Sequence, residues 1–227
     1  LPKAPASAAE PAPVAAAPAS GPDLALESAA TTPPHAARAT LLLALVFATT
    51  MFTGTAMAAH LPRLMLASGT TLATAVFVGA LVGPSQVAAR LLEFGVLRRL
   101  HPTLSARLST LLHPIGVLLL GLFGAPAATA FGVLHGAGNG LLTIAKGTLP
   151  LAIFGPAGYG RRQGVISLPA RISQASAPWL FGLCLDRWGA HALWLSAALG
   201  LLAFTALLGV PVPARPGAIL PIAAQGR

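Results

Sequence analysis

The sequence predicts an all-α membrane protein with six transmembrane helices, and three observations support this prediction. Hydrophobic residues make up 55% of the 227 residues and charged residues only 8%, against about 25% charged residues in an ordinary soluble domain. Short segments that contain most of the Lys and Arg residues separate the apolar stretches. The stretch at residues 127–153 contains no acid and one cation, Lys146, and it exceeds the roughly 20 apolar residues that span a bilayer.

The N-terminal segment, residues 1–37, has a different composition from the rest of the chain. It is mostly Ala and Pro with scattered Ser and acidic residues, a composition that offers little to bury and removes backbone donors. We predict that it is a disordered linker or tail. Because the chain starts at Leu1 without a methionine and this segment lacks the apolar run of a signal peptide, we expect a processed chain or a fragment.

Six apolar stretches follow, and together they predict a transmembrane domain at residues 38–210. Pro62 is expected to end the first helix, because proline removes a backbone donor and clashes with the preceding turn. Prolines from Pro211 onward are expected to end the sixth helix and to leave residues 211–227 as a cytoplasmic tail. The six spans are predicted at about residues 40–60, 70–97, 104–123, 127–153, 164–185 and 190–210.

The fourth predicted helix carries a regular series of glycines. Gly132, Gly136 and Gly140 recur at every fourth residue, which puts all three on one helical face. A face of glycines allows the backbone of a neighbouring helix to approach closely, so we expect this face to pack against another helix. The glycines are not a dinucleotide-binding loop, because such a loop follows a β-strand in a soluble βαβ unit.

The basic residues predict how the helices are oriented. Six spans put both chain ends on the same side of the membrane, and the positive-inside rule decides which side that is. Only Arg63 and Arg187 lie in the segments on the opposite side, so both termini are expected to be cytoplasmic. The nine cations on the side of the termini are Lys3, Arg38, Arg98, Arg99, Arg107, Arg161, Arg162, Arg215 and Arg227.

Four charged residues lie at depth inside the predicted spans, where a charge is costly unless it meets a partner or water. At a rise of about 1.5 Å per residue, Arg90, Lys146 and Arg171 each lie about 10 Å from the cytoplasmic end of a helix. Glu93, one turn after Arg90, is the only acid available to this layer. We interpret the four as gating or coupling residues around a cavity that attracts an anionic substrate; alternatively, the arginines snorkel to the interface and Glu93 merely neutralises one of them.

Four uncharged polar residues lie deeper in the same helices. Gln86, His135, Asn139 and Gln174 are candidates for contact with a small-molecule solute. The alternative is that they form interhelical hydrogen bonds, which contribute about 0.6 to 2 kcal/mol each in membrane proteins.

Other function classes lack their characteristic residues. The cations lie in short loops instead of gathering on one face, so we expect no nucleic-acid binding. The six histidines are not at metal-ligand spacing, the chain has no Gly-x-Ser-x-Gly motif, and we expect neither a metal, another cofactor nor enzymatic activity. The single cysteine, Cys184, cannot form an internal disulfide.

Two short motifs resemble those of major facilitator superfamily transporters. Residues 182–189, GLCLDRWG, resemble the Gly-x-x-x-Asp-Arg-x-Gly signature that recurs at helix ends in that superfamily. Residues 158–164, GYGRRQG, resemble the Arg- and Gly-rich loop before its penultimate helix. Residues 83–99 depart from the similar motif expected between the second and third helices, because Glu93 and the basic residues after it are spaced differently.

The resemblance covers residues 40–210 and implies the C-terminal six-helix half of such a transporter, with both termini cytoplasmic. The implied partners are the lipid bilayer, a small solute and an N-terminal six-helix half, in the same chain or a separate one. The implied activity is secondary active transport by alternating access, with proton coupling as one option, in a bacterial plasma (inner) membrane. The alternative function is a six-helix membrane scaffold or partner subunit without transport activity.

Overall fold

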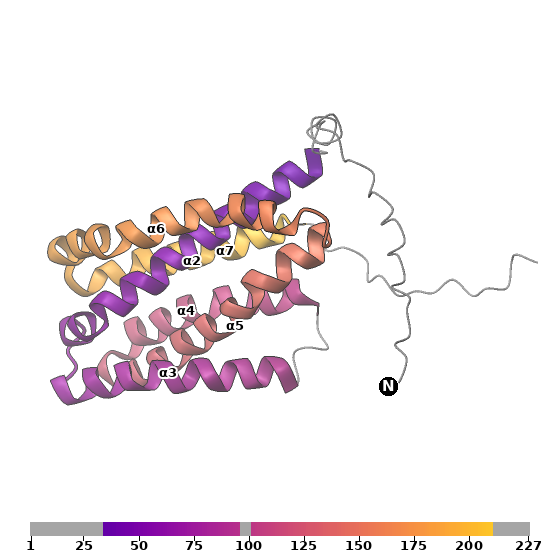
Figure 1. Cartoon of the computed structure of the whole chain (residues 1–227). Helices are drawn as coiled ribbons and strands as arrows, with labels where there is room; N and C mark the ends of the chain where they lie inside the picture. Colours follow the sequence, from indigo (N-terminus) through magenta and orange to yellow (C-terminus); the bar gives the residue numbers. More distant parts are fainter. Residues whose placement is uncertain (1–33, 96–100, 211–227) are drawn as a thin grey trace, which may run out of the picture. The chain divides into compact units, whose positions relative to one another are not determined.

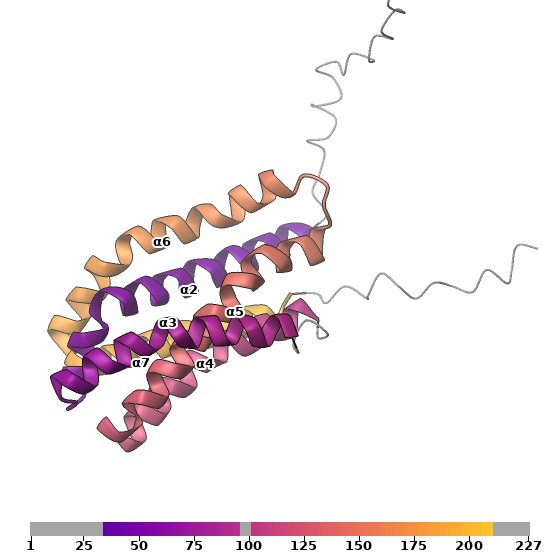
Figure 2. The same ribbon diagram turned by 60° about the horizontal axis from the view of Figure 1, so that its bottom comes forward.

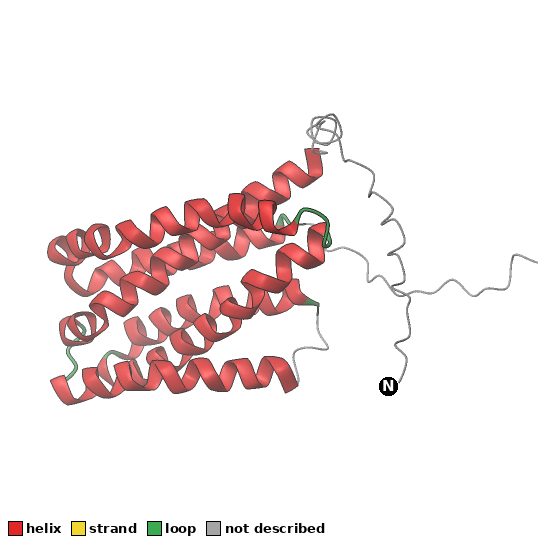
Figure 3. Cartoon of the chain, viewed as in Figure 1, coloured by secondary structure: helices red, strands yellow, loops and turns green. Residues whose placement is uncertain are grey.

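The computed structural model describes residues 34–95 and 101–210, and these residues form six α-helices joined by short turns (Figure 1). They contain no β-strand (Figure 3), which confirms the predicted all-α class. The predicted C-terminal tail and residues 1–33 of the predicted N-terminal tail lie outside the described residues. The helices are α2 (Pro34–Ala67), α3 (Leu72–Gly95), α4 (Pro102–Phe123), α5 (Ala128–Phe154), α6 (Tyr159–Trp188) and α7 (Ala192–Leu208).

The helices lie close to their predicted positions, with two main differences. Helix α2 does not end at Pro62, as predicted, but continues to Ala67. Leu64 and Met65 are fully buried after the proline, so packing of this last segment offsets the lost backbone hydrogen bond. Helix α6 begins earlier than predicted, at Tyr159, directly after Gly158, whose φ of 64° makes the turn from α5.

Not every helix has the composition of a membrane span. Four segments of the described chain are long and apolar enough to cross a membrane, and these are Ala36–Ala67, Leu72–Gly95, Pro102–Phe123 and Tyr159–Leu208. The last segment contains both α6 and α7. Helix α5 is not among them, because its glycines and its residues His135, Asn139 and Lys146 lower its mean hydropathy. The structure is that of a helical, apolar membrane protein, and a count of six spans stays a prediction.

The helices of residues 34–210 run alternately in opposite directions, so both ends of this segment lie at the same end of the bundle (Figure 1). The helices form two groups of three. Helix α2 packs against α6 and α7, and α5 packs against α3 and α4, while α4 and α7 join the groups (Figure 2). The pattern of contacts is symmetric. If α2 is exchanged with α5, α3 with α6 and α4 with α7, the same pairs of helices are again in contact.

The core is divided along the helix axes. One apolar cluster, which contains Met57 and Phe181, lies towards the end of the bundle where α2 and α6 finish. The other, which contains Phe47 and Leu207, lies towards the end where α2 begins. The residues between the two clusters on α2, α4, α5 and α7 are largely polar or small, and they form the layer described in the next section.

The glycine face of α5 packs against α3, as predicted. A Cβ atom at Gly132 would lie 2.7 Å from Val78 Cγ1, and one at Gly136 would lie 2.6 Å from the carbonyl oxygen of Val82. At Gly140 it would meet the backbone of Gln86. Any side chain at these positions would therefore push α3 away from α5.

We predict that Gly136→Ala and Gly140→Ala each lower the free energy of unfolding by about 1 to 3 kcal/mol, because the added methyl group overpacks the contact with α3. Gly147→Ala is the matched control, because Gly147 lies on the same helix and a Cβ atom there would meet nothing within 4 Å. Thermal or denaturant unfolding of the purified protein in detergent measures the difference. Equal stability of all three variants would contradict the close approach of α3 and α5.

Candidate functional site

A layer of polar side chains crosses the middle of the bundle, between the two apolar clusters. Polar groups in this position are costly unless each finds a hydrogen-bond partner inside the protein, because neither the cores nor the bilayer supplies one. The layer spans four helices, and its buried members are Thr49, Thr50, Thr53, Ser109, Thr110, His113, His135 and Ser196.

The centre of this layer is a chain of hydrogen bonds across α7, α4 and α5. Ser196 Oγ donates to the carbonyl oxygen of Leu193 at 2.7 Å, so it accepts from His113 Nε2 at 2.9 Å. His113 Nδ1 then lies 3.0 Å from His135 Nδ1, and His135 Nε2 lies 3.1 Å from Asn139 Nδ2. The two rings meet edge to face, with centroids 4.9 Å apart. Every ring nitrogen of the pair therefore has a partner.

Two cavities meet at this chain. A cavity of about 30 Å³ lies beside His113, and the side chains that line it include the hydroxyl group of Thr53, whose Oγ1 is buried without a partner. This volume is large enough for one water molecule. A larger groove of about 370 Å³ runs between α2, α3 and α5. His135 and Asn139 line both cavities, so they form the wall between them.

Three of the four predicted solute-contact residues lie together at the groove. Gln86, His135 and Asn139 line it from α3 and α5. Gln174 is not among the groove-lining residues; it lies on α6, where its Oε1 accepts a hydrogen bond from Arg171 at 3.2 Å. Of the four, only His135 makes the interhelical hydrogen bond that the alternative interpretation expects, since the bonds of the others run within their own helices.

Two of the three cations of the predicted layer contact a neighbouring helix. Arg90 Nη2 lies 3.4 Å from Thr143 Oγ1 on α5, and Lys146 Nζ lies 2.9 Å from the sulfur of Met51 on α2. Arg171 is exposed on α6, and its positive charge lies close enough to Lys146 to repel it. A thioether is a weak acceptor, so Lys146 has no strong partner among the described residues.

Glu93 forms an ion pair with neither Arg90 nor Arg171, although the snorkelling interpretation has it neutralise one of the two. Within the described ranges 34–95 and 101–210, Arg63 and Asp186 form the only ion pair. Glu93 Oε2 and Arg90 Nε are both buried without a hydrogen-bond partner. The spacing of three residues puts these side chains on one face of α3 without bringing their charged atoms together.

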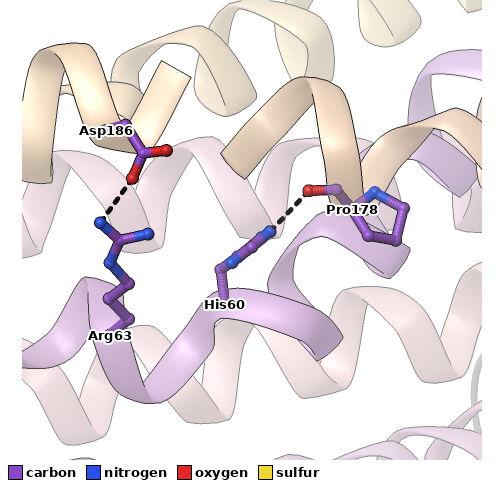
Figure 4. Close-up of polar contacts among 4 residues, drawn as sticks. All are labelled: His60, Arg63, Pro178 and Asp186. Atoms are coloured by element: carbon purple, nitrogen blue, oxygen red, sulfur yellow. Dashed lines mark hydrogen bonds and ion pairs between the residues drawn. The ribbon is translucent and has the colours of Figure 1, made fainter. Parts of the chain in front are cut away.

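A second set of polar contacts joins α2 to α6 near the other end of the bundle (Figure 4). Arg63 Nη2 donates to Asp186 Oδ1 at 2.6 Å, and His60 Nε2 donates to the carbonyl oxygen of Pro178 at 2.8 Å. Asp186 belongs to the motif at residues 182–189. Because the two charged side chains are 58% and 59% exposed, their pairing contributes only about 0 to 1 kcal/mol.

Sequence reasoning did not select His113 or Ser196 as site residues. Their contact joins α4 to α7, and nothing in the local pattern shows that two residues so far apart in the chain meet. A histidine and a serine inside otherwise apolar helices were the available signals.

The described part of the chain places no group of three His, Cys, Asp or Glu side chains together in a way that would hold a metal ion. No model of a known protein family matches the chain, and no curated protein matches it.

We predict that Ser196→Ala lowers the free energy of unfolding by about 1 to 2 kcal/mol, because His113 Nε2 would lose its only partner in a buried, apolar site. Thr205→Val is the matched control. Thr205 lies on the same helix and also donates to the carbonyl three residues earlier, but it is exposed and meets no histidine. If unfolding in detergent shows the same stability for both variants, the hydrogen-bond chain does not hold α4 to α7.

Proposed function

We propose that the chain is one six-helix half of a secondary active transporter of the major facilitator type, which moves a small solute by alternating access. The observation that carries this proposal is the groove between α2, α3 and α5. It begins at the buried polar layer, where Gln86, His135 and Asn139 line it, and extends along the apolar cluster that contains Met57. Transporters of this class bind their substrates near the bilayer midplane, where polar groups converge between helices.

The packing of the helices supports the same proposal. Each six-helix half of a major facilitator transporter consists of two three-helix repeats of inverted topology. In this chain, the pairing of α2 with α6 and α7 corresponds to the pairing of α5 with α3 and α4 after exchange of the first and last three helices. A scaffold without transport activity has no need of this arrangement around a polar groove.

The cations of the predicted layer indicate the charge of the solute. Arg90 Nη2 donates a hydrogen bond of 3.5 Å to Oε1 of Gln86, which lines the groove. Lys146 and Arg171 add two more positive charges, which have no acidic partner among the described residues. This excess favours an anionic or zwitterionic solute. We assign these cations to gating or coupling, with Glu93 beside them on α3.

On this proposal, the apolar surfaces of the helices face the bilayer and an N-terminal six-helix half, and the chain ends lie in the cytoplasm of a bacterial cell. On this proposal the groove is completed by the partner half, because α2, α3 and α5 supply only one side of a cavity between two halves.

The test is uptake into proteoliposomes that contain the chain joined to the N-terminal half, with labelled organic anions, cations and zwitterions and an imposed proton gradient. We predict gradient-dependent flux that falls about tenfold or more in Lys146→Leu and in Arg171→Leu, because each change removes a charge from the coupling layer. Arg161→Leu is the control, since Arg161 is an exposed cation outside this layer.

Absence of flux for every solute, in a preparation shown to be folded, would contradict the proposal and favour the scaffold or partner-subunit alternative. Flux that is equal in all three variants would leave transport standing and contradict the assignment of the cations to gating or coupling.

A further inference from the structure

We propose that His113 and His135 form a storage site for one proton, which is loaded and unloaded at His135 from the groove. The two imidazoles share a direct hydrogen bond between their Nδ1 atoms, 3.0 Å apart, with both rings buried. This geometry requires that one of the two nitrogens carries a proton and the other a lone pair. The pair is therefore a single unit in which one ring donates and the other accepts.

The neighbours of the pair determine which tautomer each ring adopts. The hydroxyl proton of Ser196 goes to the carbonyl oxygen of Leu193, so His113 must carry its proton on Nε2 and offer a lone pair on Nδ1. His135 then carries its proton on Nδ1 and accepts from Asn139 at Nε2. All four hydrogen bonds point in the same direction, from Asn139 towards Leu193, and both rings are neutral.

One site in this arrangement accepts a further proton without breaking the contact between the rings. A proton taken from water in the groove binds the lone pair of His135 Nε2, and rotation of the Asn139 amide replaces its NH₂ group by Oδ1 as the partner. The charge of the pair rises by one. The proton between the two Nδ1 atoms can then move towards His113, so that the charge is spread over both rings.

The series of hydrogen bonds ends at a group that passes no proton on. Beyond His113 it continues only to the hydroxyl of Ser196 and the backbone carbonyl of Leu193, which has no proton to donate. His113 does not line the groove, whereas His135 and Asn139 do. Along these hydrogen bonds, a proton that enters at His135 can leave only at His135, so the pair stores a proton and passes none on to Ser196.

The surroundings supply dipoles but no fixed counter-charge. The groups that face the pair are Thr50 and Thr53 from α2, Ser109 and Thr110 from α4, Asn139 from α5 and Ser196 from α7, and none is a carboxylate or a cation. On the remaining helices, the cations Arg90 of α3 and Arg171 of α6 bond to glutamines instead. The cavity beside the unpartnered Thr53 Oγ1 has room for one water molecule, which would further solvate the protonated pair.

The role of this site in transport rests on the proposed function. Without a carboxylate nearby, an anionic solute in the adjoining groove is the natural counter-charge for the protonated pair. By linkage, the anion then favours protonation and the proton favours binding of the anion to the same degree. Proton and anion therefore cross together.

Nuclear magnetic resonance of the full chain in lipid nanodiscs, with ¹⁵N-labelled histidine, tests the proton site without any transport assay. We predict a scalar coupling across the hydrogen bond between the Nδ1 atoms of His113 and His135. On stepwise acidification, for as long as the chain stays folded, the signals of both rings should shift together with uptake of one proton.

His60 is the matched control in this experiment, because its Nε2 also bonds within the bundle, but to the carbonyl of Pro178 and not to another imidazole. Its ring should show no such coupling. Absence of the coupling between His113 and His135 in a folded chain would overturn the proposal. Independent titration of the two rings, or uptake of two protons, would do the same.

A second experiment tests the coupling role in the reconstituted transporter. In His113→Gln, proton-driven accumulation of the solute should fall about tenfold or more, while solute exchange in the absence of a proton gradient should fall by much less. His60→Gln should change neither the proton-driven accumulation nor the exchange. Unaltered proton-driven accumulation in His113→Gln would overturn the role of the pair in proton–solute coupling. Lack of any flux in the unmodified protein would count against the proposed transport function, but it would not affect the proton site that the magnetic resonance experiment tests.

Discussion

The middle of the bundle depends on the hydrogen bond between His113 and His135. Two imidazoles in an apolar, membrane-embedded interior are costly unless each ring nitrogen has a partner, and this contact completes the set. Through Ser196 it also ties α4 to α7, the two helices that join the three-helix groups of the bundle. The apolar clusters hold the two ends, but the polar layer determines how the groups are aligned at mid-depth.

The glycine face of α5 has a complementary role. Gly136 and Gly140 bring the backbone of α5 against α3, while His135 and Asn139, each one residue earlier, face the groove instead. The rotation of about 100° per residue separates the packing face from the polar face on the same helix. Close packing thus fixes the positions of the groove-lining side chains, and the shape of the proposed binding site follows from residues that do not contact the solute.

The accuracy of the sequence analysis depended on how local each feature is. Helix positions and the glycine face follow from periodicity within one segment, and the structure confirms them. Interhelical partners do not follow from the sequence, and the contact of His113 with Ser196 was missed. The alternative in which Glu93 neutralises Arg90 or Arg171 finds no such ion pair among the described residues, because residues on one helical face need not bring their charged atoms together. Pro62 was expected to end a helix that tertiary packing continues.

Alternating access requires that the groove opens to each side of the membrane in turn. Gly83 lines the groove, and a Cβ atom there meets nothing within 4 Å, so Gly83→Cys in a Cys184→Ser background adds a reporter thiol without overpacking. In sealed vesicles that contain both halves, we predict reaction with a membrane-impermeant thiol reagent from either side, slowed from both sides by bound solute. Reaction from one side only, unchanged by any solute, would contradict alternating access and favour a scaffold.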